Sequence, residues 1–406
     1  MRERVVASYC TTFLKREMLH IYRQVCALRC YRTFVMTKAL QNAERFPFSD
    51  IELIPKPRIN PLRHGWLKFV ERRPPIVYRG EYQMLASLLE RRGADLMHIY
   101  FGHTGVHLLP FIRRWDKPCI VSFHGADVAL KRDIRDYELK LQELFQAVPL
   151  ILARCQSLAD RLVSLGCPPE RLRISRTGLP LKEFPYVRRE APSDGRWHFL
   201  QACRLIPKKG VATTLCAFAI FQKEFPRAEL SIAGKGPLQG HLEELAEELG
   251  ISAKVHFHGF VSQSQLKELY AASHLFIHPS ETPPDLNQEG IPNSVLEAMS
   301  TGLAVLGTRH GGIPEAVEHG RGGLLVEERD FEALAIAMKG IARSTNAFRE
   351  MGVLGSEFVG ANFEQSAQIR QLERFYDEAV AMAPEQIPAP VVERIPPTER
   401  FAEQVP

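Results

Sequence analysis

The sequence predicts an α/β protein made of two doubly wound parallel sheets that face each other across a cleft. Short apolar runs rich in branched and aromatic residues alternate with segments of helical periodicity along the chain. Such alternation favours parallel strands joined by helices. A polar, proline-containing segment at 185–196 interrupts the pattern, and 406 residues suit two or three domains. We therefore expect two sheets on either side of this linker.

The individual elements follow from the same patterns. In the first half, we expect strands at 96–100, 119–123 and 150–153, and helices at 132–146 and 157–166. In the second half, we expect strands at 198–202, 228–233, 255–257, 275–278, 304–307 and 323–326. Helices are expected between them at 211–224, 238–249, 263–272, 294–300 and 331–341, and a final one from about residue 364 to 382. The six prolines of 383–406 predict a disordered tail.

Composition excludes several classes of protein. Hydrophobic residues make up 45% and charged residues 24%, as in ordinary globular proteins, which excludes fibres and wholly disordered chains. The longest apolar run, 215–221, is too short to span a bilayer. The N-terminus lacks the apolar core of a secretory signal, and the eight cysteines form no Cys-x-x-Cys pair. We expect a cytoplasmic protein with reduced thiols.

Charge is distributed unevenly between the two halves. Residues 1–190 hold 33 Lys and Arg against 19 Asp and Glu, a net charge of +14, and the remainder carries −9. A basic half favours an anionic partner: a membrane surface, nucleic acid or a phosphorylated substrate. The alternative is a solvated basic surface without a partner. Within this half, 15–29 can form an amphipathic helix whose apolar stripe either meets a membrane or packs into the core.

Arg204 and Lys209 lie between a predicted strand, 198–202, and a predicted helix, 211–224. Helix N-termini attract anions, and two cations beside one would form a cradle for a diphosphate. We expect Lys209 to lie in a solvated cleft. The alternative is an exposed basic turn.

Glu289 and Glu297 bracket the start of the helix predicted at 294–300. Carboxylates beside free backbone amides suit sugar hydroxyls, which both donate and accept hydrogen bonds. The alternative is a capped surface helix with two ordinary acids. His124 directly follows the strand predicted at 119–123, which is a ligand-facing position in such sheets, although a lone histidine is more often structural.

Two absences narrow the chemistry further. The sequence holds no Walker A motif and no Asp-x-Asp pair to carry a metal. We therefore expect no metal site and no cofactor. Neutralisation of a diphosphate would then depend on Arg204, Lys209 and helix dipoles.

Taken in order, these segments resemble glycosyltransferase family 4, whose members are retaining enzymes with the GT-B fold of two Rossmann-like domains. The exopolysaccharide and colanic-acid biosynthesis type is the most similar. The resemblance covers about 95–376 and rests on 95–102, 123–127, Arg204 with Lys209, 233–237, 257–259, 279–280, 289–297 and 311–315. It departs at 8–14, where many relatives have a glycine-rich loop near the donor phosphates and this chain has no glycine.

The resemblance implies a domain division and a role for each site residue. It implies an acceptor-side domain at 1–188, a donor-binding domain at 189–363, and a helix at 364–381 that packs back on the first domain. Arg204 and Lys209 would bind the donor diphosphate. The sugar would be held by Glu289 with the amides of Gly290, Ile291 and Pro292, and the ribose by Glu297. Val261 would line the base pocket, and His124 would lie beside the transferred sugar.

The resulting expectation is a retaining, metal-independent hexosyltransferase. It would move a sugar from a nucleotide-sugar to a lipid-linked or polysaccharide acceptor in exopolysaccharide or cell-surface glycan synthesis. Its other partner would be an anionic membrane surface at the inner face of the cell membrane, and not nucleic acid. The alternatives are a catalytically inactive sugar-nucleotide-binding subunit and a GT-B epimerase or phosphorylase.

Overall fold

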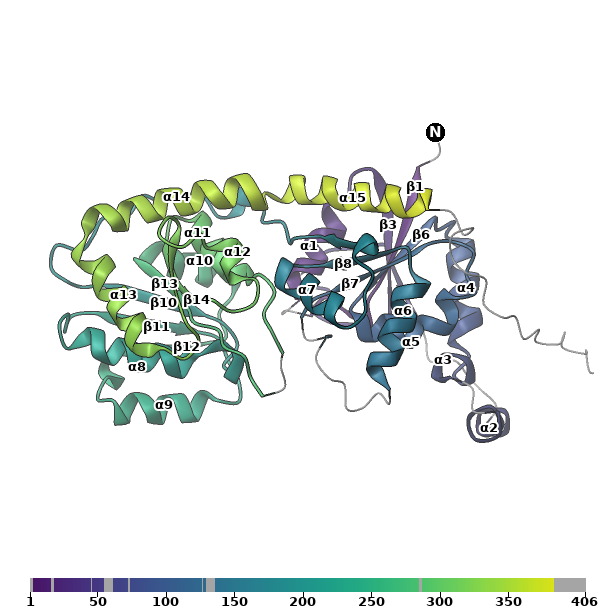
Figure 1. Ribbon diagram of the computed structural model, residues 1–406, viewed down its shortest axis with the longest axis horizontal. Coiled ribbons are helices and arrows are strands. Elements are labelled where there is room, and N and C mark those ends of the chain that lie inside the picture. Colours follow the sequence, from purple (N-terminus) through teal and green to yellow (C-terminus); the bar gives the residue numbers. More distant parts are fainter. Residues whose placement is uncertain are drawn as a thin grey trace, which may run out of the picture.

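A computed structural model describes residues 3–15, 18–44, 46–54, 61–71, 74–125, 127–128, 136–284 and 287–382. Two parallel sheets, each covered by helices, lie one after the other along the long axis of the molecule, and the final helices run along one side of both (Figure 1). The predicted α/β architecture with two doubly wound sheets is confirmed. The tail predicted at 383–406 lies outside the described residues.

The first sheet has seven described strands in the order β5-β3-β1-β6-β7-β8-β9. Their bounds are Arg4–Tyr9 (β1), Tyr31–Thr37 (β3), Ile51–Leu53 (β5), Leu96–Tyr100 (β6), Cys119–Phe123 (β7), Leu150–Ala153 (β8) and Leu172–Ile174 (β9). The helices are Leu19–Ala27 (α1), Pro61–Gly65 (α2), Trp66–Val70 (η2), Pro75–Tyr78 (α3), Glu81–Arg91 (α4), Gly102–Ile112 (α5), Tyr137–Ala147 (α6) and Gln156–Ser164 (α7). A small pair, Thr12–Phe13 (β2) and Ala39–Leu40 (β4), lies apart from the main sheet.

The second sheet has six described strands in the order β12-β11-β10-β13-β14-β15. They are His198–Ala202 (β10), Glu229–Ala233 (β11), Val255–Gly259 (β12), Leu275–His278 (β13), Ala304–Thr308 (β14) and Gly323–Val326 (β15). The helices are Val211–Gln222 (α8), Gln239–Glu248 (α9), Gln263–Ala272 (α10), Asn293–Ser300 (α11), Ile313–Ala316 (α12), Phe331–Arg343 (α13) and Thr345–Phe363 (α14). Short 3₁₀ turns occupy Pro169–Arg171 (η3), Leu181–Glu183 (η4), Pro207–Lys209 (η5) and Ser252–Lys254 (η6).

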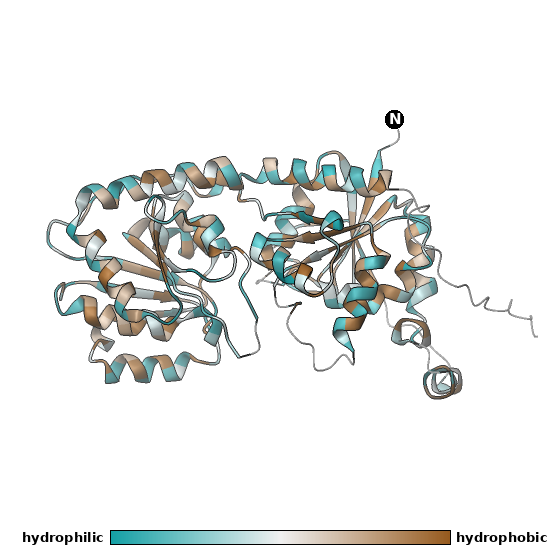
Figure 2. Cartoon of the chain, in the orientation of Figure 1, coloured by the Kyte–Doolittle hydropathy of each residue, from teal (hydrophilic) through white to brown (hydrophobic). Residues whose placement is uncertain are grey.

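Burial explains why the strands appear as continuous apolar runs in the sequence. Each residue of β6, β7, β8 and β14 is buried, because helices cover both faces of a parallel sheet. The strands of both sheets are accordingly largely brown in Figure 2, which marks hydrophobic residues. Helix α1 turns one face, with Ile21 and Val25, into the first core. Of the apolar stripe predicted at 15–29, Val25 is thus buried in this core, and Met18 and Tyr22 pack against it.

The chain crosses between the domains twice, and the two crossings pair with each other. The amide of Leu179 donates to the Phe363 carbonyl at 2.7 Å, and the amide of Gln365 donates back to the Leu179 carbonyl at 3.0 Å. A Cβ on Gly178 would lie 2.5 Å from Cα of Gln365, so this approach requires glycine. Glu364 then caps the last helix, Gln365–Ala381 (α15), which packs on the first domain.

Candidate active site

The strand order of the second sheet reverses between β10 and β13, which is where a doubly wound sheet forms a crevice. The chain leaves β10 toward β11 and leaves β13 toward β14, so the two following loops diverge. Ligands of doubly wound sheets bind in such crevices at the carboxyl ends of the strands. The loop after β10 carries Arg204, Lys208 and Lys209, and the loop after β13 carries Glu289. The predicted site residues of the second domain therefore gather at one sheet edge.

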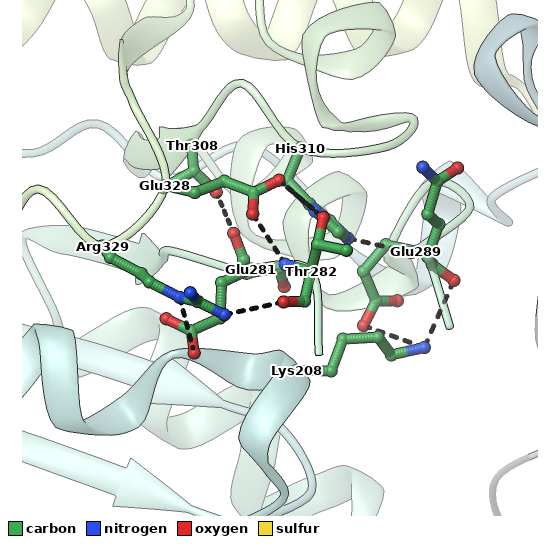
Figure 3. A network of polar contacts seen from close by, with 10 residues as sticks. Lys208, Glu281, Thr282, Glu289, Thr308, His310, Glu328 and Arg329 are labelled. Carbon is green, nitrogen blue, oxygen red and sulfur yellow. Dashed lines mark hydrogen bonds and ion pairs between the residues drawn. The ribbon is translucent and has the colours of Figure 1, made fainter. Parts of the chain in front are cut away.

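A buried ion pair joins these two loops. Oε1 of Glu289 lies 2.6 Å from Nζ of Lys209 and 3.5 Å from Nζ of Lys208, as Figure 3 shows for the second pair. Burial by itself raises the pKa of Glu289, but the charges of the two lysines outweigh burial and lower it to about 2. The carboxylate is therefore ionised at neutral pH, as a strong hydrogen-bond acceptor and a weak base.

The expectation that Lys209 lies in a solvated cleft is wrong. Its exposed fraction is 9%, because Glu289 and its loop cover the ammonium group. The neighbouring Lys208, which the sequence reasoning missed, has an exposed fraction of 7% and donates to the Gln288 carbonyl at 3.3 Å. Its position beside Lys209 was the signal that could have identified it. Arg204, in contrast, is exposed.

A polar network fixes the loop after β13 (Figure 3). His310 Nδ1 lies 2.7 Å from a Glu328 carboxylate oxygen, and His310 Nε2 accepts from the Glu289 amide at 3.1 Å. The same carboxylate accepts from the amide of Thr282 at 2.7 Å. Because Nε2 is an acceptor, the ring hydrogen lies on Nδ1 and points at the Glu328 carboxylate. The network fixes the backbone at the Glu289 amide and at Thr282, earlier in the same loop.

Sugar binding by the backbone of 290–292 stays a prediction, but the structure shows which of its groups can donate. Within the described residues, the amides of Gly290 and Ile291 donate to no protein acceptor, so they are open to a ligand. Pro292 was predicted with them, but proline has no N–H and serves instead as the residue before helix α11. A Cβ on Gly311 would lie 2.4 Å from the Glu289 carbonyl, so glycine there lets the loop close.

Glu297 lies inside α11 and is buried, with an exposed fraction of 5%. Its carboxylate accepts from Arg23 of α1 at 3.2 Å and from the Tyr270 hydroxyl at 3.1 Å. Burial raises the pKa of Glu297 despite the opposing effect of the Arg23 charge. Both carboxylate oxygens thus have a protein partner, one of them from the first domain. Val261, the predicted base-pocket residue, is half-buried against the apolar core near α10 and α11.

In the first domain, a buried carboxylate shapes the turn that carries His124. Asp127 accepts hydrogen bonds from the amides of His124, Gly125 and Gly102, each at 2.9 Å. The turn reaches the second domain, because a Cβ on Gly125 would lie 2.7 Å from the Gln288 carbonyl. His124, the residue before Gly125, therefore lies near the loop that carries Glu289.

Two further groups complete the first-domain side. His124 Nδ1 lies 3.2 Å from Nε2 of His20, and burial, followed by the charge of Arg154, lowers the pKa of His124 well below its ordinary value. Arg154 follows β8, has an exposed fraction of 6%, and forms no hydrogen bond or ion pair with a described residue. Arg154 directly follows a buried strand, as His124 does. The same sequence signal that singled out His124 could therefore have identified Arg154. The described residues contain no cluster of three or more His, Cys, Asp or Glu arranged to hold a metal ion.

Comparison with known proteins agrees with this geometry. Family models match residues 31–183, as Glycosyltransferase Family 4, and 185–352, as Glycosyl transferases group 1. A putative colanic acid biosynthesis glycosyltransferase of Salmonella typhimurium is 33% identical over 282 residues, covering 69% of each chain. An amylovoran biosynthesis glycosyltransferase of Erwinia amylovora is 28% identical over 281 residues, again 69% of each chain.

Solved structures show the same fold at low identity. Sucrose-phosphate synthase from Thermosynechococcus elongatus superposes with a TM-score of 0.72 at 18% identity, over 93% of this chain and 99% of its own. Anabaena Alr3699/HepE in complex with UDP-glucose superposes with a TM-score of 0.73 at 18% identity, over 92% and 99%. Both sheets of this chain therefore have the GT-B arrangement. The chain belongs to glycosyltransferase family 4 and is a nucleotide-sugar-dependent glycosyltransferase of the exopolysaccharide-biosynthesis type.

Proposed function

We propose that this enzyme transfers a hexosyl group, with retention of configuration, from a nucleoside-diphosphate sugar to a lipid-linked or polysaccharide acceptor. The observation that carries the proposal is the pairing of Glu289 with two buried lysines beside the open amides of Gly290 and Ile291. Lys209 has three N–H donors and, among the described residues, one acceptor, the Glu289 carboxylate, so donors remain for phosphate oxygens. The Lys208 ammonium already meets Glu289, the Asn287 side-chain oxygen and the Gln288 carbonyl, so it contributes its charge. The carboxylate and the amides can bind sugar hydroxyls.

The charges of the site suit a diphosphate leaving group. In the reaction the bond from the anomeric carbon to the phosphate oxygen breaks, and its electron pair goes to the diphosphate. Lys208, Lys209 and Arg204 stabilise the charge that develops there, and cations fixed in advance lower the barrier. The acceptor oxygen forms the new bond, and its proton passes to a leaving phosphate oxygen on the same face.

The ionisation of Glu289 supports retention. An inverting transferase needs a general base with a pKa near the working pH, on the face opposite the leaving group. A carboxyl with a pKa of about 2 is a poor proton acceptor at neutral pH. Glu289 is therefore suited to bind hydroxyls rather than to deprotonate the acceptor. A same-face transfer to the leaving phosphate needs no such base.

Replacing Lys209 tests the diphosphate role. The variant Lys209→Ala loses a charge-assisted contact worth about 1.5–3 kcal/mol, so kcat/KM should fall roughly 10- to 150-fold at ~1.4 kcal/mol per decade. The measurement is release of nucleoside diphosphate from a panel of UDP-, GDP- and ADP-sugars. Because Lys209 is buried beside Glu289, the thermal midpoint should also fall, so the assay is run where the variant is folded.

Lys223→Ala is the matched control, because this exposed lysine lies just beyond α8 in the same domain. It should stay within twofold of the wild type. A folded Lys209→Ala enzyme with unchanged kcat/KM would exclude the diphosphate role.

We propose that transfer needs no divalent metal, since the sequence has no Asp-x-Asp pair and the crevice supplies its own cations. Activity should persist in excess EDTA. Protein passed over a chelating resin and assayed with added EDTA gives the measurement. Loss of activity that Mg²⁺ or Mn²⁺ restores would contradict the proposal.

We also propose peripheral binding to the inner face of the cell membrane, through 61–70 of the first domain. No described helix is long and apolar enough to cross a bilayer. In α2 and η2, however, Leu62, Trp66, Phe69 and Val70 have exposed fractions of 83%, 58%, 71% and 58%. Figure 1 shows α2 at the edge of the first domain, away from the second. The sequence from 55 to 73 adds six Lys and Arg against one acid, which suits anionic headgroups.

Vesicle binding tests this segment. The double variant Trp66→Ser/Phe69→Ser should bind phosphatidylglycerol vesicles at low salt at least about tenfold more weakly than the wild type, since burying one such ring contributes ~1.5–3 kcal/mol. Co-sedimentation of the full chain gives the measurement. Leu139→Ser/Ile336→Ser removes apolar groups of similar exposure, 60% and 71%, and should bind normally. Equal binding of both double variants, or equal wild-type binding to phosphatidylcholine, would contradict the proposal.

A further inference from the structure

A chain of hydrogen-bonded side chains crosses the first sheet to His124. The Tyr376 hydroxyl, on α15, lies 2.8 Å from Nδ1 of His98, on β6. Nε2 of His98 lies 3.0 Å from Oγ of Ser122, which lies 3.1 Å from Nε2 of His124. His124 Nδ1 then meets Nε2 of His20 at 3.2 Å. In Figure 1, α15 runs along the side of the first domain beside β6, so the chain links this outer helix to the site.

Every member of the chain is neutral, so its hydrogens can be assigned. Burial lowers the pKa of His98 and of His20 to about 3 each, and raises that of Tyr376 well above its ordinary value. Each imidazole therefore carries one N–H, and Tyr376 keeps its hydroxyl hydrogen. A neutral imidazole donates through one nitrogen and accepts through the other. Among the described residues the Ser122 hydroxyl meets only the two histidines, and if it accepted from both, its own hydrogen would be buried without an acceptor, which is costly. The hydrogen bonds from Tyr376 to His124 therefore run in one of two directions.

The hydroxyl of Tyr376 decides between the two directions. Tyr376 is fully buried, and within the described residues its hydroxyl has no partner except Nδ1 of His98. If His98 donated to Tyr376, the tyrosine hydrogen would be buried without an acceptor, which is costly. Tyr376 must therefore donate to His98. His98 then donates through Nε2 to Ser122, and Ser122 donates to Nε2 of His124.

We propose that Tyr376 and His98 are positioning residues that hold His124 as the tautomer with its hydrogen on Nδ1. In the structure this N–H donates to His20. In a cleft filled by substrate, the same N–H is the group that His124 offers to a sugar oxygen, and this last step rests on the proposed function. His124 thus acts as a fixed hydrogen-bond donor, because its other nitrogen is committed to Ser122.

Nitrogen NMR of the full-length protein tests the tautomer without using activity. With ¹⁵N-labelled histidine, and the signals of His124 assigned by their loss in His124→Asn, Nδ1 should show the shift of a protonated nitrogen and Nε2 that of an unprotonated one. Tyr376→Phe removes only the hydroxyl, so both directions of the chain become populated. The two His124 shifts should then move toward each other. Ser122→Ala breaks the next link and should also move them.

Tyr31→Phe is the matched control. The Tyr31 ring lies 5.2 Å from that of Tyr376, and its hydroxyl donates to Asp377 of the same helix at 2.7 Å, outside the chain. It should leave the His124 shifts unchanged. A protonated Nε2 in the wild type, or His124 shifts that Tyr376→Phe and Ser122→Ala both leave unchanged, would overturn the proposal. An inactive enzyme with the expected shifts would contradict the proposed function and leave the tautomer assignment intact.

Discussion

The ion pair of Glu289 with Lys209 and Lys208 is the interaction on which the site depends. A buried carboxylate is unfavourable without partners, and so are two buried ammonium groups. The ion pair between these groups holds the loop after β10 against the loop after β13, with Nζ of Lys209 2.6 Å from Oε1 of Glu289. Two positive charges against one negative leave a net positive crevice, to which Arg204 adds. This excess is what a diphosphate would neutralise.

The geometry around the pair is set by groups that have no chemical role of their own. His310 and Glu328 fix the backbone of Glu289 from one side. Glycines allow two neighbouring segments to approach the loop that carries Glu289, because a side chain at Gly311 or Gly125 would meet a carbonyl oxygen of this loop. The first domain contacts the second domain at this site through the His124 turn and through the ion pair of Arg23 with Glu297. The site is therefore complete only where both domains meet.

The sequence predicted the parts of this structure that depend on local pattern. Strands β6, β7 and β8 were predicted at their observed bounds because each is a continuous apolar run covered on both faces. Lys209 was predicted at the end of a strand and Glu289 in the loop before a helix, and only the family resemblance implied that both meet the same donor. The first strands, β1 and β3, were not predicted individually, and helix α14 was missed. Residues 132–135 of the helix predicted at 132–146 lie outside the described residues, and α6 begins at Tyr137.

Long-range contacts could not be predicted in this way. Tyr376 meets His98 across 278 positions of sequence, and Arg23 meets Glu297 across 274. Nothing local to either residue shows its partner. Lys209 was expected in solvent because its own segment is a polar turn, whereas a loop nearly 80 residues later covers it. Burial of a charged group is a property of the tertiary structure, and the pKa of Glu289 follows from it.

The most direct test of the account is the ionisation of Glu289, followed by ¹³C NMR of its carboxyl group, with the signal assigned through Glu289→Gln. The wild-type resonance should remain that of an ionised carboxylate from pH 7 to pH 4, because its pKa lies near 2. Lys209→Met removes the charge that most strongly opposes the effect of burial on Glu289. The pKa of Glu289 should therefore rise, and its resonance should titrate at higher pH. Lys223→Met should match the wild type. A wild-type Glu289 that titrates at or above the ordinary pKa of 4.5, or one that Lys209→Met leaves unchanged, would contradict the account.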